Sequence, residues 1–208
     1  MDIHAPMEPI HSWRDIALHL GIITIGLFIA LSLEGLVEHL HNRHLVHEAR
    51  ANIRQEIEDN HEAAQQDLIN LQTCIEQQKA NIQAIHNLQD NPHFHGSVSN
   101  TYSINPMQDA AWHTARDTGA LSFIPYNEVQ RYSNLYALSD FVNNQSITIT
   151  QNEILAQASF GMGIDPSKFP ADEYTRLLRE NATIETQAYT LRQIIQQLDD
   201  KYVAELKQ

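Results

Sequence analysis

The sequence contains only one cysteine, Cys74, which excludes an internal disulfide framework. Glycine and proline are also scarce, with seven copies of each in 208 residues, and this disfavours a β-rich or loop-rich domain. Glutamine, asparagine, alanine, leucine and isoleucine are abundant instead, a composition that suits long helices. The length allows one modest helical domain with a hydrophobic core.

Basic residues are scarce as well, and the common catalytic motifs are absent from the sequence. The chain has 13 Lys and Arg against 26 Asp and Glu, so its formal net charge is -13. Nucleic-acid binding needs clustered cations that neutralise phosphates, and we therefore expect no nucleic-acid partner. The sequence has no nucleophile elbow, P-loop, HExxH motif or paired-cysteine motif. We expect that the protein is not an enzyme and uses no cofactor.

One long apolar run is present. Residues 16–37, IALHLGIITIGLFIALSLEGLV, contain no Lys or Arg, and Glu34 is their only carboxylate. As a helix the run would be about 33 Å long, enough to cross a bilayer core of about 30 Å. No small-x-small cleavage site follows it, so we predict an uncleaved anchor rather than a signal peptide. The predicted domains are an irregular tail (1–12), a transmembrane helix (13–40) and a helical-bundle domain (41–208).

Helical periodicity continues after the apolar run. No helix breaker appears before Asn91-Pro92, so we predict an unbroken helix from about residue 13 to residue 90. Two series of positions spaced by seven form a heptad seam that must pack against other helices, within the chain or in a second copy. The first series is Ile57, Ala64, Leu71, Gln78 and Ile85, and the second is His61, Leu68, Ile75 and Ile82. Cys74 lies beside this seam, so in-register pairing of two chains would bring two thiols together.

Three further helices are expected beyond a loop at 91–105. Asn105-Pro106 and Gly119 are typical of the two ends of a short helix. Pro125 begins a longer helix, to which we assign the β-branched stretch 146–150, and Pro170 begins the last one. The apolar face of the longer helix is Val129, Tyr132, Leu135, Tyr136, Leu138, Phe141 and Val142. The seam of the last helix is Leu177, Ala188, Ile184, Leu191, Ile195, Leu198 and Tyr202.

These elements predict an all-α fold. A single N-terminal transmembrane helix continues into a long helix, which packs in an antiparallel three- or four-helix bundle. We expect Trp112, the largest apolar side chain of the short helix, to lie in the core near Tyr132 and Tyr136.

Two stretches resemble a group of uncharacterised bacterial single-pass membrane proteins. The first, IGLFIALSLEGLVEHLHNRHLVHEARANIRQEIEDN, is similar to their N-terminal IGxLIALxxE segment, which passes directly into a charged helix. The second, MQDAAWHTARDTGALSFIPYNEVQRYSNLYALSDFV, is similar to their Trp-bearing helix, GAL turn and Tyr-containing helix. The resemblance implies a helical C-terminal domain and a location in the bacterial inner membrane. It implies no activity.

Cationic side chains just after the apolar run are candidate ligands for lipid headgroups. Five of them lie at near-helical spacing: His39, Arg43, His47, Arg50 and Arg54. Such a stripe outside a bilayer binds anionic lipid with about 1 kcal/mol per cation. Another set, Glu38, His41 and His44, is a candidate metal site that would need ligands from another helix or subunit. The alternatives are a solvated polar face and a face that senses pH.

Two ionisable residues lie inside the apolar run. His19 and Glu34 are functional candidates for that reason, although each lies near one end of the run. In the loop, His93-Phe94-His95 is a further candidate metal-binding pair.

We expect a membrane-anchored structural or interaction protein that oligomerises or scaffolds partners. Two alternatives stay open: a sensor-like ligand-binding bundle, and a channel or transporter accessory subunit with Glu34 in the membrane. The expected partners are the lipid bilayer and a second copy of the chain or another membrane protein. Within about twenty residues of the run, one Arg precedes it and three follow it. This count favours a cytoplasmic C-terminal domain, and the side of the membrane stays open.

Overall fold

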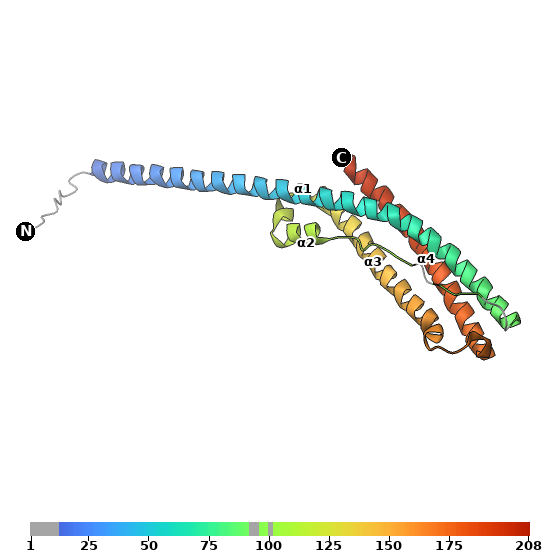
Figure 1. Ribbon diagram of the computed structural model, residues 1–208. Coiled ribbons are helices and arrows are strands. Elements are labelled where there is room, and N and C mark those ends of the chain that lie inside the picture. Colours follow the sequence, from blue (N-terminus) through green and yellow to red (C-terminus); the bar gives the residue numbers. More distant parts are fainter. Residues whose placement is uncertain (1–12, 92–95, 100–101) are drawn as a thin grey trace, which may run out of the picture. The chain divides into compact units, whose positions relative to one another are not determined.

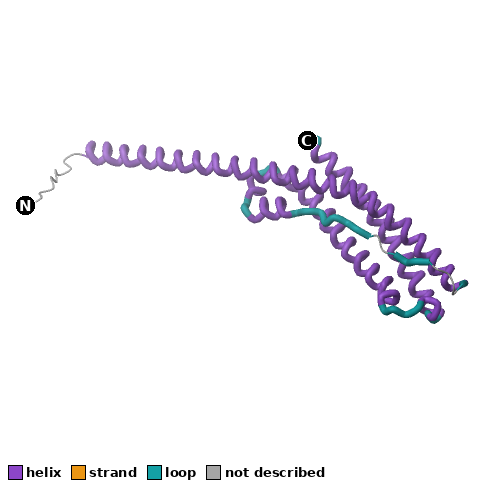
Figure 2. Tube along the Cα trace, viewed as in Figure 1, coloured by secondary structure: helices purple, strands orange, loops and turns teal. Residues whose placement is uncertain are grey.

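The computed structural model describes residues 13–91, 96–99 and 102–208, and the regular structure among them is entirely helical (Figures 1 and 2). Its elements are α1 (Trp13–Asp90), α2 (Ala110–Asp117), a 3₁₀ turn η1 (Ala120–Phe123), α3 (Tyr126–Gly161), a second turn η2 (Pro166–Lys168) and α4 (Ala171–Leu206). The predicted all-α fold is confirmed. The chain divides into two compact units, Met1–His47 and Glu48–Gln208, and α1 contributes to both.

In the first unit, α1 buries none of its apolar side chains. From Trp13 to Leu40, every residue except Gly21 is exposed within the chain. The hydroxyls of Thr24 and Ser32 donate to main-chain carbonyls one turn earlier, at 2.7 Å in both cases. Their polarity is therefore satisfied inside the helix, as an apolar surrounding requires. This segment is long and apolar enough to cross a membrane.

The second unit, which we call the bundle, combines residues of α1 from Glu48 onward with α3 and α4 (Figure 1). Hydrogen bonds fix the directions of the helices. Within the bundle, the first residues of α1 bond to the start of α3 and later residues of α1 bond nearer its end. These two helices therefore run in the same direction. The first residues of α1 within the bundle also bond to the end of α4, and later residues of α1 bond to its first half. Helix α4 therefore runs in the opposite direction.

An extended stretch runs back along the bundle between α1 and α3. We call its described residues, 96–99 and 102–109, the return segment. Its start bonds to Asn81 of α1 and its end to Asn60, so it runs opposite to both helices. The directions of α1, the return segment, α3 and α4 thus alternate, and the return segment takes the place of the second helix of a four-helix bundle.

The heptad seam of α1 is only partly as predicted. The first series, 57, 64, 71, 78 and 85, is buried in full. Of the second predicted series only Ile75 is buried, whereas His61, Leu68 and Ile82 are half-buried. The second buried series lies one residue earlier and consists of Ile53, Asn60, Asp67, Cys74, Asn81 and Leu88. Since one chain buries both series, the seam is used within the chain.

The helix boundaries also show one error and several confirmations. The first helix ends at Asp90 and the stretch 146–150 lies within α3, as predicted. The short helix begins at Ala110 and not at Pro106. The main chain of Asn105 and Met107 is bonded to side chains of α1 and α3 instead, which holds these residues out of a helix. After α2, Gly119 has a φ of 78°, the left-handed conformation in which glycine commonly ends helices.

The apolar packing of α3 and α4 follows the predicted pattern with three exceptions, all on α3. All seven predicted seam residues of α4 are buried. On α3, however, Phe141 is 46% exposed and Val129 and Leu138 are half-buried, so the apolar face is narrower than predicted. At one end of the bundle, Ile85 and Leu88 pack with Phe169, Tyr174 and Leu177 in a cluster that closes the turn between α3 and α4.

Candidate functional site

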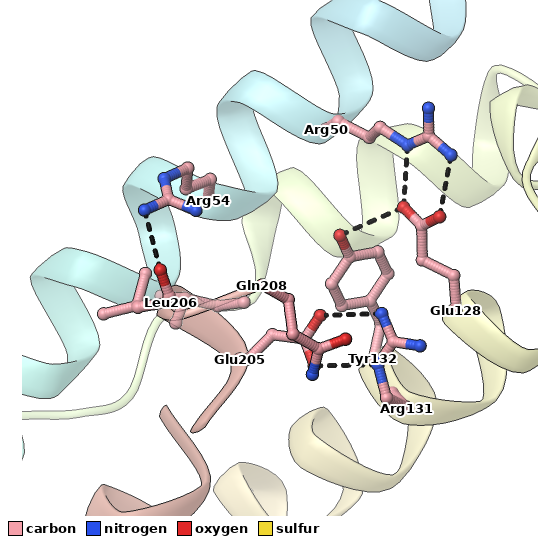
Figure 3. A pocket seen from close by; sticks show the side chains of 9 residues that line it. Arg50, Arg54, Glu128, Arg131, Tyr132, Glu205, Leu206 and Gln208 are labelled. Carbon is pink, nitrogen blue, oxygen red and sulfur yellow. Dashed lines mark hydrogen bonds and ion pairs between the residues drawn. The ribbon is translucent and has the colours of Figure 1, made fainter. Parts of the chain in front are cut away.

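Arginines and glutamates gather at the end of the bundle where α3 begins and α4 finishes (Figure 3). Arg50 of α1 donates from Nε and Nη2 to the two carboxylate oxygens of Glu128, both at 2.7 Å. Arg131 of α3 makes the same fork with Glu205 of α4, at 3.0 and 3.2 Å. The two forks tie α3 to both of its helical neighbours.

A third arginine completes this cluster, which encloses a pocket of about 400 Å³. Arg54 donates to the main-chain oxygen of Leu206 at 2.9 Å and lies 3.3 Å from Glu58. Carbonyls in the last turn of a helix have no partner within the helix, so this bond satisfies one of them. The pocket lining holds three guanidinium groups and two carboxylates. The formal charge of these side chains is therefore +1.

The ion pair between Arg50 and Glu128 shifts the pKa values of both partners. The hydrogen bond from Arg50 is the main reason that the pKa of Glu128 lies below its ordinary value, and it raises the pKa of Arg50 in turn. The phenol of Tyr132 also donates to Glu128, at 3.2 Å. Both partners stay ionised at neutral pH, so the pocket is suited to holding helices together. It is not suited to proton transfer.

A second set of polar groups lies inside the bundle and holds the return segment. The side-chain amides of Asn60, Asn81 and Asn143 each accept from the main-chain N–H, and donate to the main-chain oxygen, of one residue of the segment. The residues recognised in this way are Gln108, Ser99 and Met107, respectively. Asn60 and Asn81 are at most 2% exposed. These bonds replace the ladder that a neighbouring strand would provide.

Two carboxylates extend this set toward the end of the segment that leads into α2. Asp67 accepts from the main-chain and side-chain nitrogens of Asn105, at 3.0 and 2.8 Å. Glu56 accepts from the main-chain N–H of Ala111 at 2.8 Å and from the phenol of Tyr136 at 2.7 Å. Its carboxylate thus lies at the N-terminus of α2, where negative charge is favourable.

Burial changes the acidity of several groups near the return segment. It raises the pKa of Asp67 to about 6, against the effect of its hydrogen bonds to Asn105. It also raises the pKa of the Cys74 thiol to about 12, and the nearby Glu153 adds to this shift. Cys74 is therefore an unreactive thiol in the folded chain.

The structure places the predicted headgroup ligands in two groups. Arg50 and Arg54 belong to the bundle pocket and are bonded there to protein groups. His39, Arg43 and His47 belong to the first unit and are exposed within the chain. Headgroup binding stays a prediction for all five.

The predicted metal ligands Glu38, His41 and His44 are exposed on α1. Across the described part of the chain, no three His, Cys, Asp or Glu side chains come together as a metal site would require. The pair His93 and His95 lies outside the described residues.

Three other predicted residues have clear positions. His19 and Glu34 are exposed on the apolar helix, and a ring nitrogen of His19 lies 2.7 Å from the main-chain oxygen of Asp15. Trp112 stacks on Tyr136, with ring centroids 5.4 Å apart and planes inclined by 12°. The predicted neighbour Tyr136 is thus confirmed, but Trp112 is half-buried and not in the core as predicted.

Comparisons with protein-family models, with curated proteins and with solved structures found no match for this chain. The resemblance to bacterial single-pass proteins therefore stays a prediction.

The sequence contained a signal for the polar set that the prediction overlooked. Asn60, Asp67 and Asn81 lie seven and fourteen residues apart, in register with the apolar series one step away. Polar residues at heptad core positions specify a particular partner at a cost in stability. Here that partner is the main chain of the return segment.

Proposed function

We propose that the protein is a non-enzymatic structural or interaction protein, a helical bundle held at a membrane by the apolar part of α1. The resemblance described above favours the bacterial inner membrane. The bilayer is the first partner, and a second copy of the chain or another membrane protein is the next.

One observation carries the proposal: the bundle buries its apolar side chains, whereas the apolar span leaves them exposed within the chain. The bundle buries its seams, with Leu71, Ile85 and Ile195 at 0% exposure. The apolar span has no such cover, and Ile23, Phe28 and Val37 are each at least 65% exposed. Exposed apolar surface on this scale marks a membrane or a protein interface. A helix that is apolar on all sides suits lipid better than a one-sided protein contact.

The charges near the span fit the same function. His39, Arg43 and His47 follow it in sequence and are exposed within the chain, so they are available to anionic headgroups. Self-association would use the apolar span or the outer faces of the bundle, because the heptad seam is occupied within one chain.

Membrane extraction tests the anchor. The full chain should stay in the membrane pellet after washing with alkaline carbonate. A chain shortened to residues 48–208 should appear in the supernatant with the helical circular dichroism of the bundle. Release of the full chain, or pelleting of the short one, would contradict the proposal.

A further inference from the structure

A groove of about 490 Å³ lies between α3 and the return segment. It shares no residue with the arginine pocket. One wall consists of residues 102–104 and Pro106, and the other of α3 residues from Asn143 to Ile154. A volume of this size is typical of sites for small molecules.

The α3 wall has an apolar rim. Ile147 and Ile154 lie seven residues apart on the helix and are 56% and 65% exposed. Ile104 and Pro106 add apolar surface on the opposite wall. An apolar chain of a few carbons that lies along this rim would remove both isoleucines from water.

The groove also contains a buried acid. Glu153 is 3% exposed and accepts from the side-chain amide of Gln78 at 3.3 Å. The phenol of Tyr102 lies in the same lining and donates to the main-chain oxygen of Ser146 at 3.3 Å. Burial is the main cause of the raised pKa of Tyr102, and the charges of Glu153 and Asp67 add to it. Glu153 is the only acidic residue in the lining of the groove, and the lining includes no Lys, Arg or His.

We propose that this groove binds a small organic cation, a primary alkylammonium, with the ammonium at the Glu153 carboxylate and the alkyl chain along Ile147 and Ile154. Calcium and magnesium take six or more oxygen ligands, with several carboxylates at tight sites, whereas one carboxylate with neutral acceptors satisfies an ammonium. All the residues concerned belong to the bundle. The site therefore does not depend on membrane anchoring, and either proposal can fail without the other.

Methyl NMR on the full chain in a nonionic detergent tests this site with n-pentylammonium chloride as the probe. The δ1-methyl signals of Ile147 and Ile154 should shift and saturate with one dissociation constant. The methyl signal of Ile69, which is 62% exposed on α1 and outside the groove, should not move. Shortening the probe by one methylene should weaken binding about threefold to fourfold.

Two comparisons isolate the charge. Glu153→Gln should weaken binding at least tenfold, whereas Asp140→Asn, an exposed carboxylate of the same helix, should leave it unchanged. The wild-type chain should also bind neutral 1-pentanol at least tenfold more weakly, which tests the charge even if the Glu153 variant does not fold. Absence of a saturable shift at the two isoleucines, or equal affinity for pentanol, would overturn the proposal.

Discussion

Asn60, Asn81 and Asn143 do for the return segment what a neighbouring strand does in a sheet. Each amide both donates to and accepts from the main chain of one residue, so recognition does not depend on the side chain of that residue. A buried main-chain group left without a partner costs about 1–3 kcal/mol. At the residue scale, these polar side chains hold the segment against α1 and α3.

Replacing Asn81 tests this function. Asn81→Ala removes both bonds to Ser99 and a bond to Asn181 at 3.2 Å. We expect the free energy of unfolding to fall by about 2–4 kcal/mol, because buried donors and acceptors lose their partners. Urea denaturation followed by circular dichroism measures this change. Asn52→Ala on the exposed face of α1 is the control and should stay within about 0.5 kcal/mol of the wild type.

Asp67 makes the stability of the bundle depend on pH. Its pKa is raised from 3.8 to about 6, so between these pH values the folded chain holds a proton that the unfolded chain releases. The contribution of Asp67 to the free energy of unfolding therefore falls as the pH rises from about 4 to about 6, and it is constant above that range. Asp67→Asn removes this loss, since Oδ1 alone can still accept both bonds from Asn105.

Denaturation at pH 4 and pH 7 should thus show the Asn variant gaining stability on the wild type as the pH rises. The exposed Asp140→Asn variant serves as the reference and should show no such gain. Parallel pH profiles for the wild type and Asp67→Asn would contradict the assigned pKa.

At the scale of elements, α2 is a short helix held by a few contacts. Glu56 accepts from the main-chain N–H of Ala111, the second residue of α2, and Trp112 stacks on Tyr136. Full burial of a tryptophan contributes about 3–5 kcal/mol, and Trp112 is only half-buried. We expect Trp112→Ala to lower the free energy of unfolding by about 2 kcal/mol. Trp13→Ala, on the exposed part of α1, should leave thermal unfolding of the bundle unchanged; an equal effect of both changes would place Trp112 outside the packing.

The long helices were predictable, because their signals are local. No breaker interrupts α1 before Asn91, and Pro125 and Pro170 directly precede α3 and α4. The apolar series of α4 is strictly periodic, so its buried face was also correct. For these elements, spacing and start signals carry the fold.

The return segment and the sites were not predictable in the same way. A side chain that binds main chain leaves no pattern in the bound segment, so Asn105-Pro106 was misinterpreted as a helix start. The predicted second series of α1 begins at His61 and is mostly apolar, whereas the series that is buried in full lies one residue earlier and is more polar. The partners of Arg50 and Arg131 lie 78 and 74 residues away in sequence. Pairing over such separations depends on the tertiary fold and not on local spacing.

At the scale of the whole molecule, one helix carries two kinds of surface. Residues of α1 up to His47 bury no apolar core, whereas residues from Glu48 onward form the bundle with α3 and α4. A soluble chain would hide the first surface, and a bilayer hides it without any further protein contact. The central claim is therefore that residues 16–37 lie in lipid while the bundle lies in water.

Thiol labelling of cysteines placed at two isoleucine positions of α1 tests this claim most directly. Ile29 and Ile69 are 56% and 62% exposed within the chain, so the protein alone gives both the same access. In a Cys74→Ala background, Ile69→Cys should react readily with a water-soluble maleimide in opened membranes. Ile29→Cys should react at least tenfold more slowly until detergent is added, because thiolates do not form in the hydrocarbon core. Equal labelling rates at the two positions would contradict the account.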